Sequence, residues 1–181
     1  MIYIIVLELC VIIVLVWYSL DALLCKEDFV TNKHTLKKVA ECINIYFPEK
    51  NIFYDLGSSR GGFCLKLIEK CPQLQIIGID NSLIRILISK IRAFIESKKI
   101  RFIQQDILKT DISKAEIIYI YIPRVLLPKL ATKLEKEMSK DSVVITSRII
   151  FLNWKPNLII PKNIENEEDI FIYKFPFLKA K

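Results

Sequence analysis

The stretch Asn51-Ile-Phe-Tyr-Asp-Leu-Gly-Ser-Ser-Arg-Gly-Gly-Phe63 decides the fold that we predict for this chain of 181 residues. A short run of β-branched and aromatic side chains ends at Asp55, and a turn with Gly57 and Gly61 leads into a helical pattern of apolar residues. A second carboxylate, Asp80, ends the next strand-like run. A strand, a glycine turn, a helix and a strand-end carboxylate in this order are typical of a nucleotide-type cofactor site on an α/β sheet.

Strand-like and helix-like patterns alternate on both sides of this turn. We expect strands at Ile52–Leu56, Leu74–Ile79, Ile100–Gln104, Glu116–Ile122 and Ser142–Ile149. We expect helices at Thr35–Tyr46, Gly61–Cys71, Leu83–Ser97 and Val125–Met138. This alternation predicts a Rossmann-like α/β fold, with a mainly parallel sheet, helices on both faces and right-handed connections.

The carboxy-terminal part has a different pattern. Leu158–Ile160 and Asp169–Phe175 are short apolar runs that predict a final antiparallel hairpin. The segment Asn153–Glu168, rich in Pro, Asn and Glu, is expected to be a long loop. No internal repeat or second globular domain is evident.

The amino-terminal segment Ile2–Leu20 is apolar apart from Glu8 and Ser19. A helix of about 19 residues, at about 1.5 Å per residue, just spans the roughly 30 Å hydrocarbon layer of a bilayer. Trp17 and Tyr18 fall where an interfacial aromatic belt is expected. A transmembrane helix within residues 1–24 is therefore predicted.

A cleaved signal peptide is the alternative for this segment. No basic side chain precedes the apolar run, and Tyr18-Ser-Leu-Asp-Ala22 is a poor cleavage site, so we favour an uncleaved anchor. The flank that follows the run is basic, with Lys26, Lys33, Lys37 and Lys38. The positive-inside rule then places the rest of the chain in the cytoplasm or an equivalent interior compartment. Residues 25–50 are expected to form a linker and a leading helix, and residues 51–181 the catalytic domain.

The net charge of +7 is compatible with an anionic neighbour, either nucleic acid or a lipid surface. The basic residues are dispersed over several helical patterns, however, which favours solvated helix faces over a nucleic-acid site. The five cysteines form no C-x-x-C pair, and His34 is the single histidine. These residues do not supply a zinc site, and the cysteines are expected to be reduced thiols.

The candidate cofactor residues lie at the carboxyl ends of the first three strands, where ligands bind in open α/β sheets. Gly57 and Ser58 would let the backbone approach a ligand, and Gly61 would permit the turn into the helix. Asp80 is placed to accept hydrogen bonds from ribose hydroxyls, or to cap the helix that begins at Leu83, and the two roles are compatible.

Two further strand ends carry candidate residues. Asp106 follows the third strand and either contacts an adenine amino group or is a simple turn residue. Tyr121-Ile-Pro123 follows the fourth strand, where an acceptor nucleophile would meet the cofactor; the alternative is a core tyrosine followed by a loop proline. The turn does not have the G-x-G-x-x-G spacing of dinucleotide enzymes, and the chain has no G-K-[ST] of a P-loop.

Asp55-x-Gly57-x-x-x-Gly61 together with Asp80 resembles the motifs of class I, seven-β-strand S-adenosylmethionine-dependent methyltransferases. A more specific resemblance runs from about Phe29 to Tyr173. It is to the membrane-anchored protein lysine methyltransferases that act on the adenine nucleotide translocase and the ATP synthase c-subunit. It rests on the amino-terminal apolar segment and three motifs, which are Phe29-Val-Thr31, the Asp55–Gly62 turn and Ser147-Arg-Ile-Ile-Phe-Leu-Asn-Trp154-Lys-Pro156.

This resemblance implies a site and a reaction. The cofactor would be S-adenosylmethionine, the acceptor a lysine of a membrane-associated protein, and no metal would take part. The cofactor residues would be Asp55, Gly57, Ser58, Gly61, Asp80, Asn81, Asp106 and Ile107. Tyr121 and Pro123 would be the catalytic residues, and Ser147, Arg148 and Trp154 would shape the acceptor channel.

The chain departs from the family turn D-L-G-S-G-D-G-R at three positions, Ser59, Arg60 and Gly62. The same turn also resembles that of the heat-shock ribosomal-RNA 2′-O-methyltransferases, but Tyr121-Ile-Pro123 stands where that family needs an aspartate. Two alternatives stay open beside the lysine methyltransferase. One is an RNA or small-molecule methyltransferase on the same scaffold, and the other is a degenerate, non-catalytic binding protein.

Overall fold

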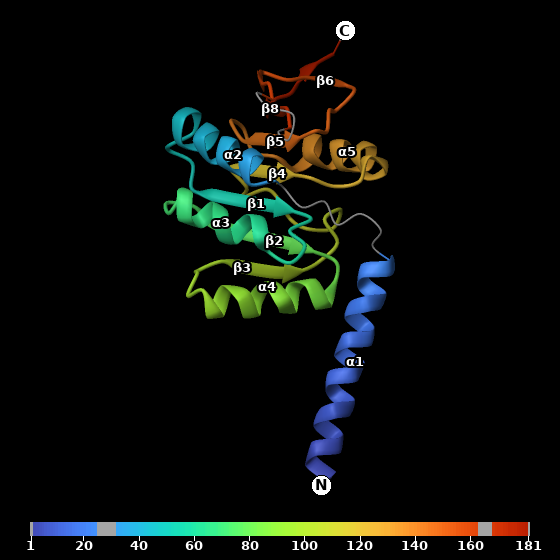
Figure 1. Ribbon diagram of the computed structural model, residues 1–181. Helices are drawn as coiled ribbons and strands as arrows, with labels where there is room; N and C mark the ends of the chain where they lie inside the picture. Colours follow the sequence, from blue (N-terminus) through green and yellow to red (C-terminus); the bar gives the residue numbers. More distant parts are fainter. Residues whose placement is uncertain (1, 25–31, 163–167, 181) are drawn as a thin grey trace.

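The computed structural model describes residues 2–24, 32–162 and 168–180. Its helices are α1 (Ile2–Leu24), α2 (Lys33–Tyr46), α3 (Gly62–Lys70), α4 (Leu83–Ile95) and α5 (Leu127–Glu137), with a 3-10 turn at Arg124–Leu126. The strands are β1 (Ile52–Leu56), β2 (Gln75–Asp80), β3 (Arg101–Gln104), β4 (Ile117–Ile120), β5 (Val143–Ser147), β6 (Trp154–Lys155), β7 (Leu158–Ile160), β8 (Ile170–Lys174) and β9 (Leu178–Lys179). Figure 1 shows α1 projecting away from a layered α/β domain.

Seven strands form the main sheet in the order β3-β2-β1-β4-β5-β8-β7. The strands β1 to β5 are parallel to one another, whereas β8 is antiparallel to both β5 and β7. This confirms the predicted Rossmann-like fold with a final antiparallel hairpin. The chain order reverses between β1 and β4, and the carboxyl ends of these two strands therefore flank the crevice where such sheets bind ligands.

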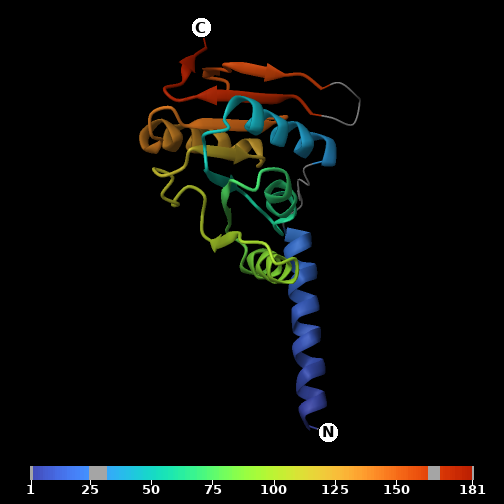
Figure 2. The same cartoon turned by 90° about the vertical axis from the view of Figure 1, so that its left-hand side faces the viewer.

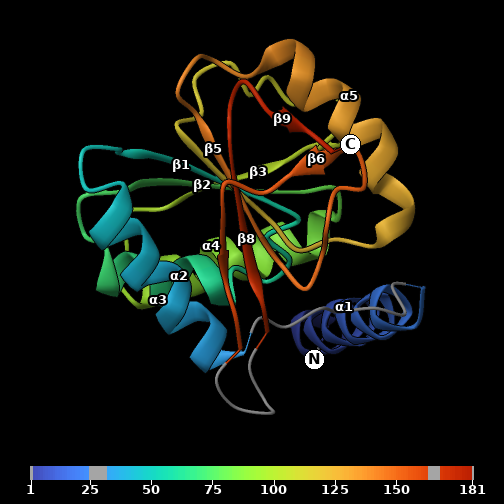
Figure 3. The ribbon, with the colours of Figure 1, turned by 90° about the horizontal axis from the view of Figure 1, so that it is seen from above.

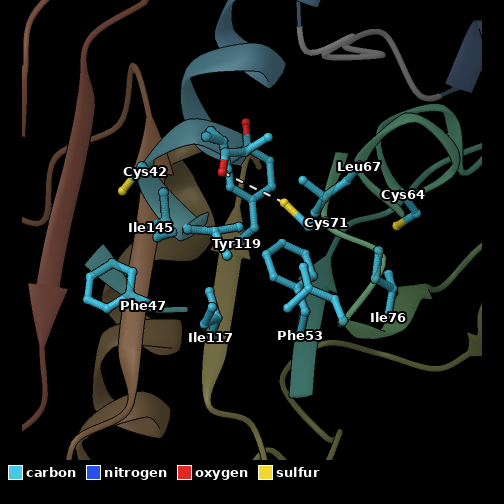
Figure 4. Close-up of a cluster of buried hydrophobic side chains, with 14 of the residues drawn as sticks. Cys42, Phe47, Phe53, Cys64, Leu67, Cys71, Ile76, Ile117, Tyr119 and Ile145 are labelled. Carbon is cyan, nitrogen blue, oxygen red and sulfur yellow. Dashed lines mark hydrogen bonds between the residues drawn. The ribbon is translucent and has the colours of Figure 1, made fainter. Parts of the chain in front are cut away.

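Helices cover both faces of the sheet. Figure 3 shows α2, α3 and α4 on one side and α5 on the other. On the first side, Phe53, Ile117 and Tyr119 pack against Leu67 and Cys71 in the apolar cluster of Figure 4. On the other side, Leu130 and Leu134 of α5 pack on β4 and β5. The strands β4 and β5 are buried along their whole length, as expected for central strands of a parallel sheet.

The helix α1 stands outside these layers. Its segment Ile2–Ser19 is long and apolar enough to cross a membrane, and none of it is buried against the domain. Figures 1 and 2 show that α1 leaves the domain beside α4.

Several element boundaries differ from the sequence-based expectation. Asn32 caps α2 by accepting a hydrogen bond from the backbone N–H of His34 (2.9 Å), so the helix already begins at Lys33. The rest of the predicted linker, including Phe29-Val-Thr31, lies outside the described residues. The helix α5 begins at Leu127, two residues later than predicted, and a 3-10 turn precedes it. Pro128 has no backbone N–H to donate, so it is tolerated only in the first turn of the helix.

Part of the segment predicted as a long loop forms a strand that was not expected. Trp154–Lys155 pairs with Leu178–Lys179 in a small antiparallel sheet. Leu158–Ile160 pairs with β8, as predicted for the hairpin. A periodicity analysis misses two-residue strands because they are shorter than one period of a detectable pattern.

Candidate functional site

The turn between β1 and α3 is fastened to β2 by backbone hydrogen bonds. The N–H groups of Gly57 and Ser58 both donate to the carbonyl of Ile79, at 2.8 and 2.9 Å. Gly57 has φ +94°, and a Cβ there would lie 2.9 Å from Cγ2 of Ile122. Gly61 has φ +73°, and a Cβ there would lie 2.7 Å from the Phe102 ring. Both glycines are therefore required by conformation and by space.

A third glycine, Gly78 in β2, was not singled out from the sequence. It pairs with Asp55 across the β1–β2 ladder. A Cβ at this position would lie 2.6 Å from the Phe102 ring and 2.9 Å from Cβ of Ser58. A glycine inside a strand is the sequence signal for such a close approach.

Ser59 also has a positive φ, of 48°. The resembled family has glycine at this point of the turn, and a positive φ is a conformation that glycine adopts more easily than any other residue. Its N–H donates to Oδ2 of Asp80 at 2.9 Å. Ser59, which departs from the family motif, is therefore hydrogen-bonded to the carboxylate at the end of β2.

A cavity of about 280 Å³ opens beside this turn, and we call it the strand-end cavity. Its lining combines the turn, the start of α2 and the ends of β1 and β4. The lining residues are Lys33, Leu36, Asp55, Gly57, Ser58, Ser59, Arg60, Gly62, Phe63, Lys66, Arg92, Tyr119 and Tyr121. The structure thus brings four predicted site residues, Asp55, Gly57, Ser58 and Tyr121, to one cavity.

Asp55 is the acidic group of the cavity. Its side chain is 3% exposed, and Oδ2 accepts a hydrogen bond from Sγ of Cys64 at 3.1 Å. Burial, together with the charge of Asp80, raises the pKa of Asp55 to about 7. The nearby Oγ of Ser58 is buried and has no hydrogen-bond partner among the described residues. A polar ligand with a positive group would supply partners for both side chains.

Asp80 lies behind the turn rather than in the lining. Its Oδ2 accepts the Ser59 N–H, and its Oδ1 accepts the Ser82 N–H, both at 2.9 Å. Ser82, not Asp80, caps α4, because the Ser82 hydroxyl accepts from the backbone N–H of Arg85. The contact of Asp80 with a ribose stays a prediction.

The remaining predicted cofactor residues lie in the loops after β2 and β3. Asn81 is exposed. Asp106 is exposed and its Oδ1 accepts the N–H of Leu108 at 2.9 Å, which closes a turn. Ile107 is buried in the cluster on the α5 side of the sheet. These positions do not line the strand-end cavity, and their contacts with a nucleoside stay predictions.

Tyr121 lines the part of the cavity where the sequence predicts the acceptor nucleophile. Its hydroxyl donates to Oε1 of Glu168 at 2.7 Å, and it also has a hydrogen bond with Arg148. Burial and the Glu168 carboxylate raise the pKa of Tyr121 to about 12, so the hydroxyl keeps its proton. The other carboxylate oxygen of Glu168, Oε2, is buried and has no partner among the described residues. Glu168 lies 47 residues from Tyr121 in the chain and was missed from the sequence.

A second tyrosine, Tyr119, forms the floor of the cavity. Its ring stacks on Phe63 with the centroids 4.2 Å apart, and its hydroxyl shares a 2.9 Å hydrogen bond with Oγ of Ser147. Ser147 is fully buried, so it supports the floor and does not line the cavity. Pro123 precedes the 3-10 turn outside the lining.

Comparison with known proteins identifies the family. Residues 55–158 match the family model described as the ANTKMT methyltransferase domain. The chain belongs to this family. The matched range begins at Asp55 and includes the turn and Trp154, which carried the resemblance noted in the sequence. It also includes Tyr121. This confirms the predicted family.

Two further relatives are a carboxy-S-adenosyl-L-methionine synthase and a methyltransferase. A carboxy-S-adenosyl-L-methionine synthase from Nautilia profundicola is 32% identical over 136 residues, covering 71% of this chain and 57% of that protein. An rRNA adenine N-6-methyltransferase from Lysinibacillus sphaericus is 26% identical over 83 residues, covering 46% of this chain and 32% of that protein. The chain therefore spans between about a third and somewhat over half of the length of these relatives.

A solved structure supports the fold. An RNA methyltransferase from Salinibacter ruber in complex with S-adenosyl-L-homocysteine superposes with a TM-score of 0.71 at 19% identity, covering 80% of this chain and 92% of that chain. At this identity the likeness shows the fold alone.

S-adenosylmethionine is the cofactor of this methyltransferase family, as predicted. The residues of the cavity fit the group. Asp55 offers a carboxylate to its cationic end, Ser58 offers a hydroxyl without a partner among the described residues, and Gly57 belongs to the lining. No cluster of three His, Cys, Asp or Glu side chains suited to a metal ion was found among the described residues.

The strand-end cavity also has basic side chains in its lining. Lys33, Arg60, Lys66 and Arg92 all line it. Arg92 donates from Nη1 to the carbonyl of Arg60 at 3.1 Å. The guanidinium of Arg60 lies 4.7 Å from the centroid of the Tyr18 ring of α1. The cavity is thus adjacent to the end of the apolar helix.

Trp154 lies elsewhere. It is buried on the α5 side of the sheet, where its ring stacks on Phe177 (centroids 3.8 Å apart) and its Nε1 donates to Oε1 of Glu135 at 2.8 Å. It lines a separate cavity of about 370 Å³ with Leu127 and Phe151. The structure therefore does not bring Trp154 into the strand-end cavity, and its predicted acceptor role stays untested.

Proposed function

We propose that this protein transfers the methyl group of S-adenosylmethionine to a lysine side chain of a membrane-associated protein. The observation that carries the proposal is the hydrogen bond that Tyr121, which lines the strand-end cavity, donates to Glu168. Membership of the ANTKMT methyltransferase family and the apolar helix α1 support the acceptor class and the membrane setting.

The cofactor set is proposed from the strand ends. Asp55 would hold the positively charged end, and the Gly57–Ser58 backbone would pass close beneath the ligand. Asp80 and Asn81 would face the ribose, and the loop of Asp106 and Ile107 would face the base. Gly61 keeps its role of turning the chain into α3.

When bound, S-adenosylmethionine supplies a methyl group already activated by the sulfonium charge, so the protein has mainly to orient a neutral amine. Tyr121 keeps its proton and donates a hydrogen bond to Glu168, while Arg148 also hydrogen-bonds to the Tyr121 hydroxyl. The remaining lone pair of the Tyr121 oxygen would accept an N–H of the lysine. Glu168 is the proposed acceptor of the proton that the ammonium loses. Burial of the amine in the cavity lowers its pKa and favours the neutral form. Pro123, Ser147 and Arg148 would fix the Tyr121 loop.

The membrane part of the proposal rests on the position of the cavity. The Arg60–Tyr18 contact holds the cavity wall against the last part of the α1 span. A domain anchored in this way meets lysines that lie close to the bilayer surface. We propose a single-pass membrane protein with its catalytic domain on the cytoplasmic or equivalent interior side.

RNA is the second candidate acceptor. The four cations that line the cavity, Lys33, Arg60, Lys66 and Arg92, favour a polyanion near the cofactor. The sequence did not predict that these four residues lie together, because the basic residues are dispersed along the chain. The methyltransferases acting on rRNA among the relatives are consistent with this alternative.

The two candidates are separated by where the methyl group goes. The full chain is incubated with methyl-labelled S-adenosylmethionine and with a membrane fraction or total RNA from the same cells. The lysine proposal expects label in membrane protein that survives ribonuclease and is lost with Tyr121→Phe or Glu168→Gln. Label only in RNA would overturn it, and absence of label with retained cofactor binding would support a non-catalytic protein.

A further inference from the structure

The outer face of α4 is apolar, which is unusual for a helix on the surface of an α/β domain. Phe94 is 86% exposed, Ile95 72% and Ile91 58%, and Leu83 and Leu87 are each exposed by more than two fifths. Helices that cover a sheet usually present charged or polar side chains to water. A contiguous exposed apolar surface of this kind marks a contact with another apolar phase.

The sequence of α4 separates two faces cleanly. Ile86, Ser89 and Ala93 are buried against the sheet, and they recur at helical spacing. Leu83, Leu87, Ile91 and Phe94 follow one another three or four residues apart and occupy another side of the helix. We call the five exposed side chains Leu83, Leu87, Ile91, Phe94 and Ile95 the α4 apolar face.

The helix α4, which carries this face, is in contact with the apolar helix α1. In Figures 1 and 2, α4 is the outermost layer of the domain on the side toward which α1 projects. Tyr18, the aromatic residue near the end of the α1 span, reaches Arg60 of the domain. A bilayer crossed by α1 would therefore meet the domain first at α4.

Basic side chains accompany this surface. Lys90 is exposed within α4, and Lys99 and Arg101 are exposed directly after it. Basic residues around an apolar helical face are the pattern of helices that lie in the interface of anionic membranes. A protein partner or a second copy would not account for the position of the face beside a membrane-length helix.

We propose that α4 lies on the lipid surface with its apolar face in the headgroup–acyl boundary. The domain is then held by two contacts, α1 across the bilayer and α4 along it. Two contacts fix the orientation of the domain, so that the strand-end cavity keeps a constant height above the lipid. This inference rests on the membrane anchoring stated in the proposed function, and it adds the surface that orients the enzyme.

The test places a tryptophan on the face and asks whether lipid quenches it. The full chain carries Trp17→Phe, so that the remaining native tryptophan, Trp154, is a buried baseline. Phe94→Trp is the probe, and Ile91→Trp is a second probe in case one variant folds poorly. Leu178→Trp, on exposed strand β9 at the opposite end of the molecule, is the matched control. Each variant is reconstituted in anionic vesicles with and without acyl chains brominated near the headgroup.

The expected result is at least twofold quenching of the probe at position 94 or 91 by brominated lipid, with the control at position 178 unchanged. Equal signals at the probes and the control overturn the inference, whether water, a second copy or a protein covers the face. Wild-type Trp17 reports the anchor separately. If Trp17 is quenched and the probes are not, only the α4 inference fails; if neither is quenched, the anchor fails with it. Methyl transfer measured in the same vesicles reports on the catalytic proposal independently.

Discussion

Replacing Asp55 by asparagine is predicted to stabilise the protein and to weaken its hold on the cofactor. The carboxylate is buried in the cavity wall, and its pKa is raised from 3.8 to about 7, mainly by burial. Burial of this kind disfavours the charged carboxylate in the folded protein. The amide of asparagine has nearly the same shape and carries no charge to bury.

The direction and magnitude of this stability change follow from the pKa values of Asp55 in the unfolded and folded protein. Between pH 4 and pH 7 the folded protein holds a proton on Asp55 that the unfolded chain has lost, so stability falls as pH rises through this window. The interval from 3.8 to about 7, at about 1.4 kcal/mol per pH unit, corresponds to a cost of about 4 kcal/mol at pH 8. Asp55→Asn removes this cost. We expect a gain approaching this value at pH 8 and little gain at pH 4.

Chemical denaturation of the full chain in detergent, at pH 4 and pH 8, measures the gain. The control is Asp111→Asn, an exposed carboxylate whose hydrogen bonds with Ser113 lower its pKa, and which must not stabilise the protein. Cofactor affinity is measured in parallel by calorimetry. Wild-type affinity is expected to rise about tenfold from pH 6 to pH 8, relative to the pH dependence of Asp55→Asn, because only the ionised carboxylate attracts the cation. Equal stability of wild type and Asp55→Asn at pH 8, or parallel pH profiles of binding, would refute the reasoning.

Three further predictions address the turn, the acceptor side and the aromatic cluster. Gly57→Ala is expected to cost about 1–3 kcal/mol and to weaken cofactor binding, whereas Gly62→Ala, which has space for a Cβ and an ordinary φ, should change stability by less than about 1 kcal/mol in denaturation experiments. Tyr121→Phe and Glu168→Gln are expected to lower kcat at least tenfold while the calorimetric Kd for the cofactor stays the same; a changed Kd would place them in the cofactor site instead. Trp154→Phe should lower the unfolding free energy by about 1–3 kcal/mol and leave the cofactor Kd unchanged; tighter or weaker binding would contradict its position across the sheet.

The parallel part of the fold was predictable because its signals are local. Ile52–Leu56 is both the predicted and the observed β1, and the alternation of strands and helices confines the sheet to a few topologies. The same rule brings strand ends together, which is why Asp55 and Tyr121 were expected at one site and line one cavity.

The parts that the sequence did not reveal depend on long-range contacts. Glu168 meets Tyr121 only because β8 enters the sheet beside β5, so that the residues before it reach the end of β4. The four cations of the cavity come from α2, the turn, α3 and α4, and no linear pattern groups them. Trp154 carried a family signal, but its partners Phe177 and Glu135 place it on the far face. Ser59 has a positive φ although it is not glycine, which the sequence did not reveal.

The identity of the methylated atom tests the account most directly. The full chain in anionic vesicles is incubated with a membrane fraction and S-adenosylmethionine carrying a deuterated methyl group, and the products are analysed by peptide and nucleoside mass spectrometry. The account predicts deuterated methyl groups on lysine Nε of membrane proteins, made by the wild type and not by Tyr121→Phe. Deuterated methyl groups found on nucleobases or ribose, with unmodified lysines, would contradict it.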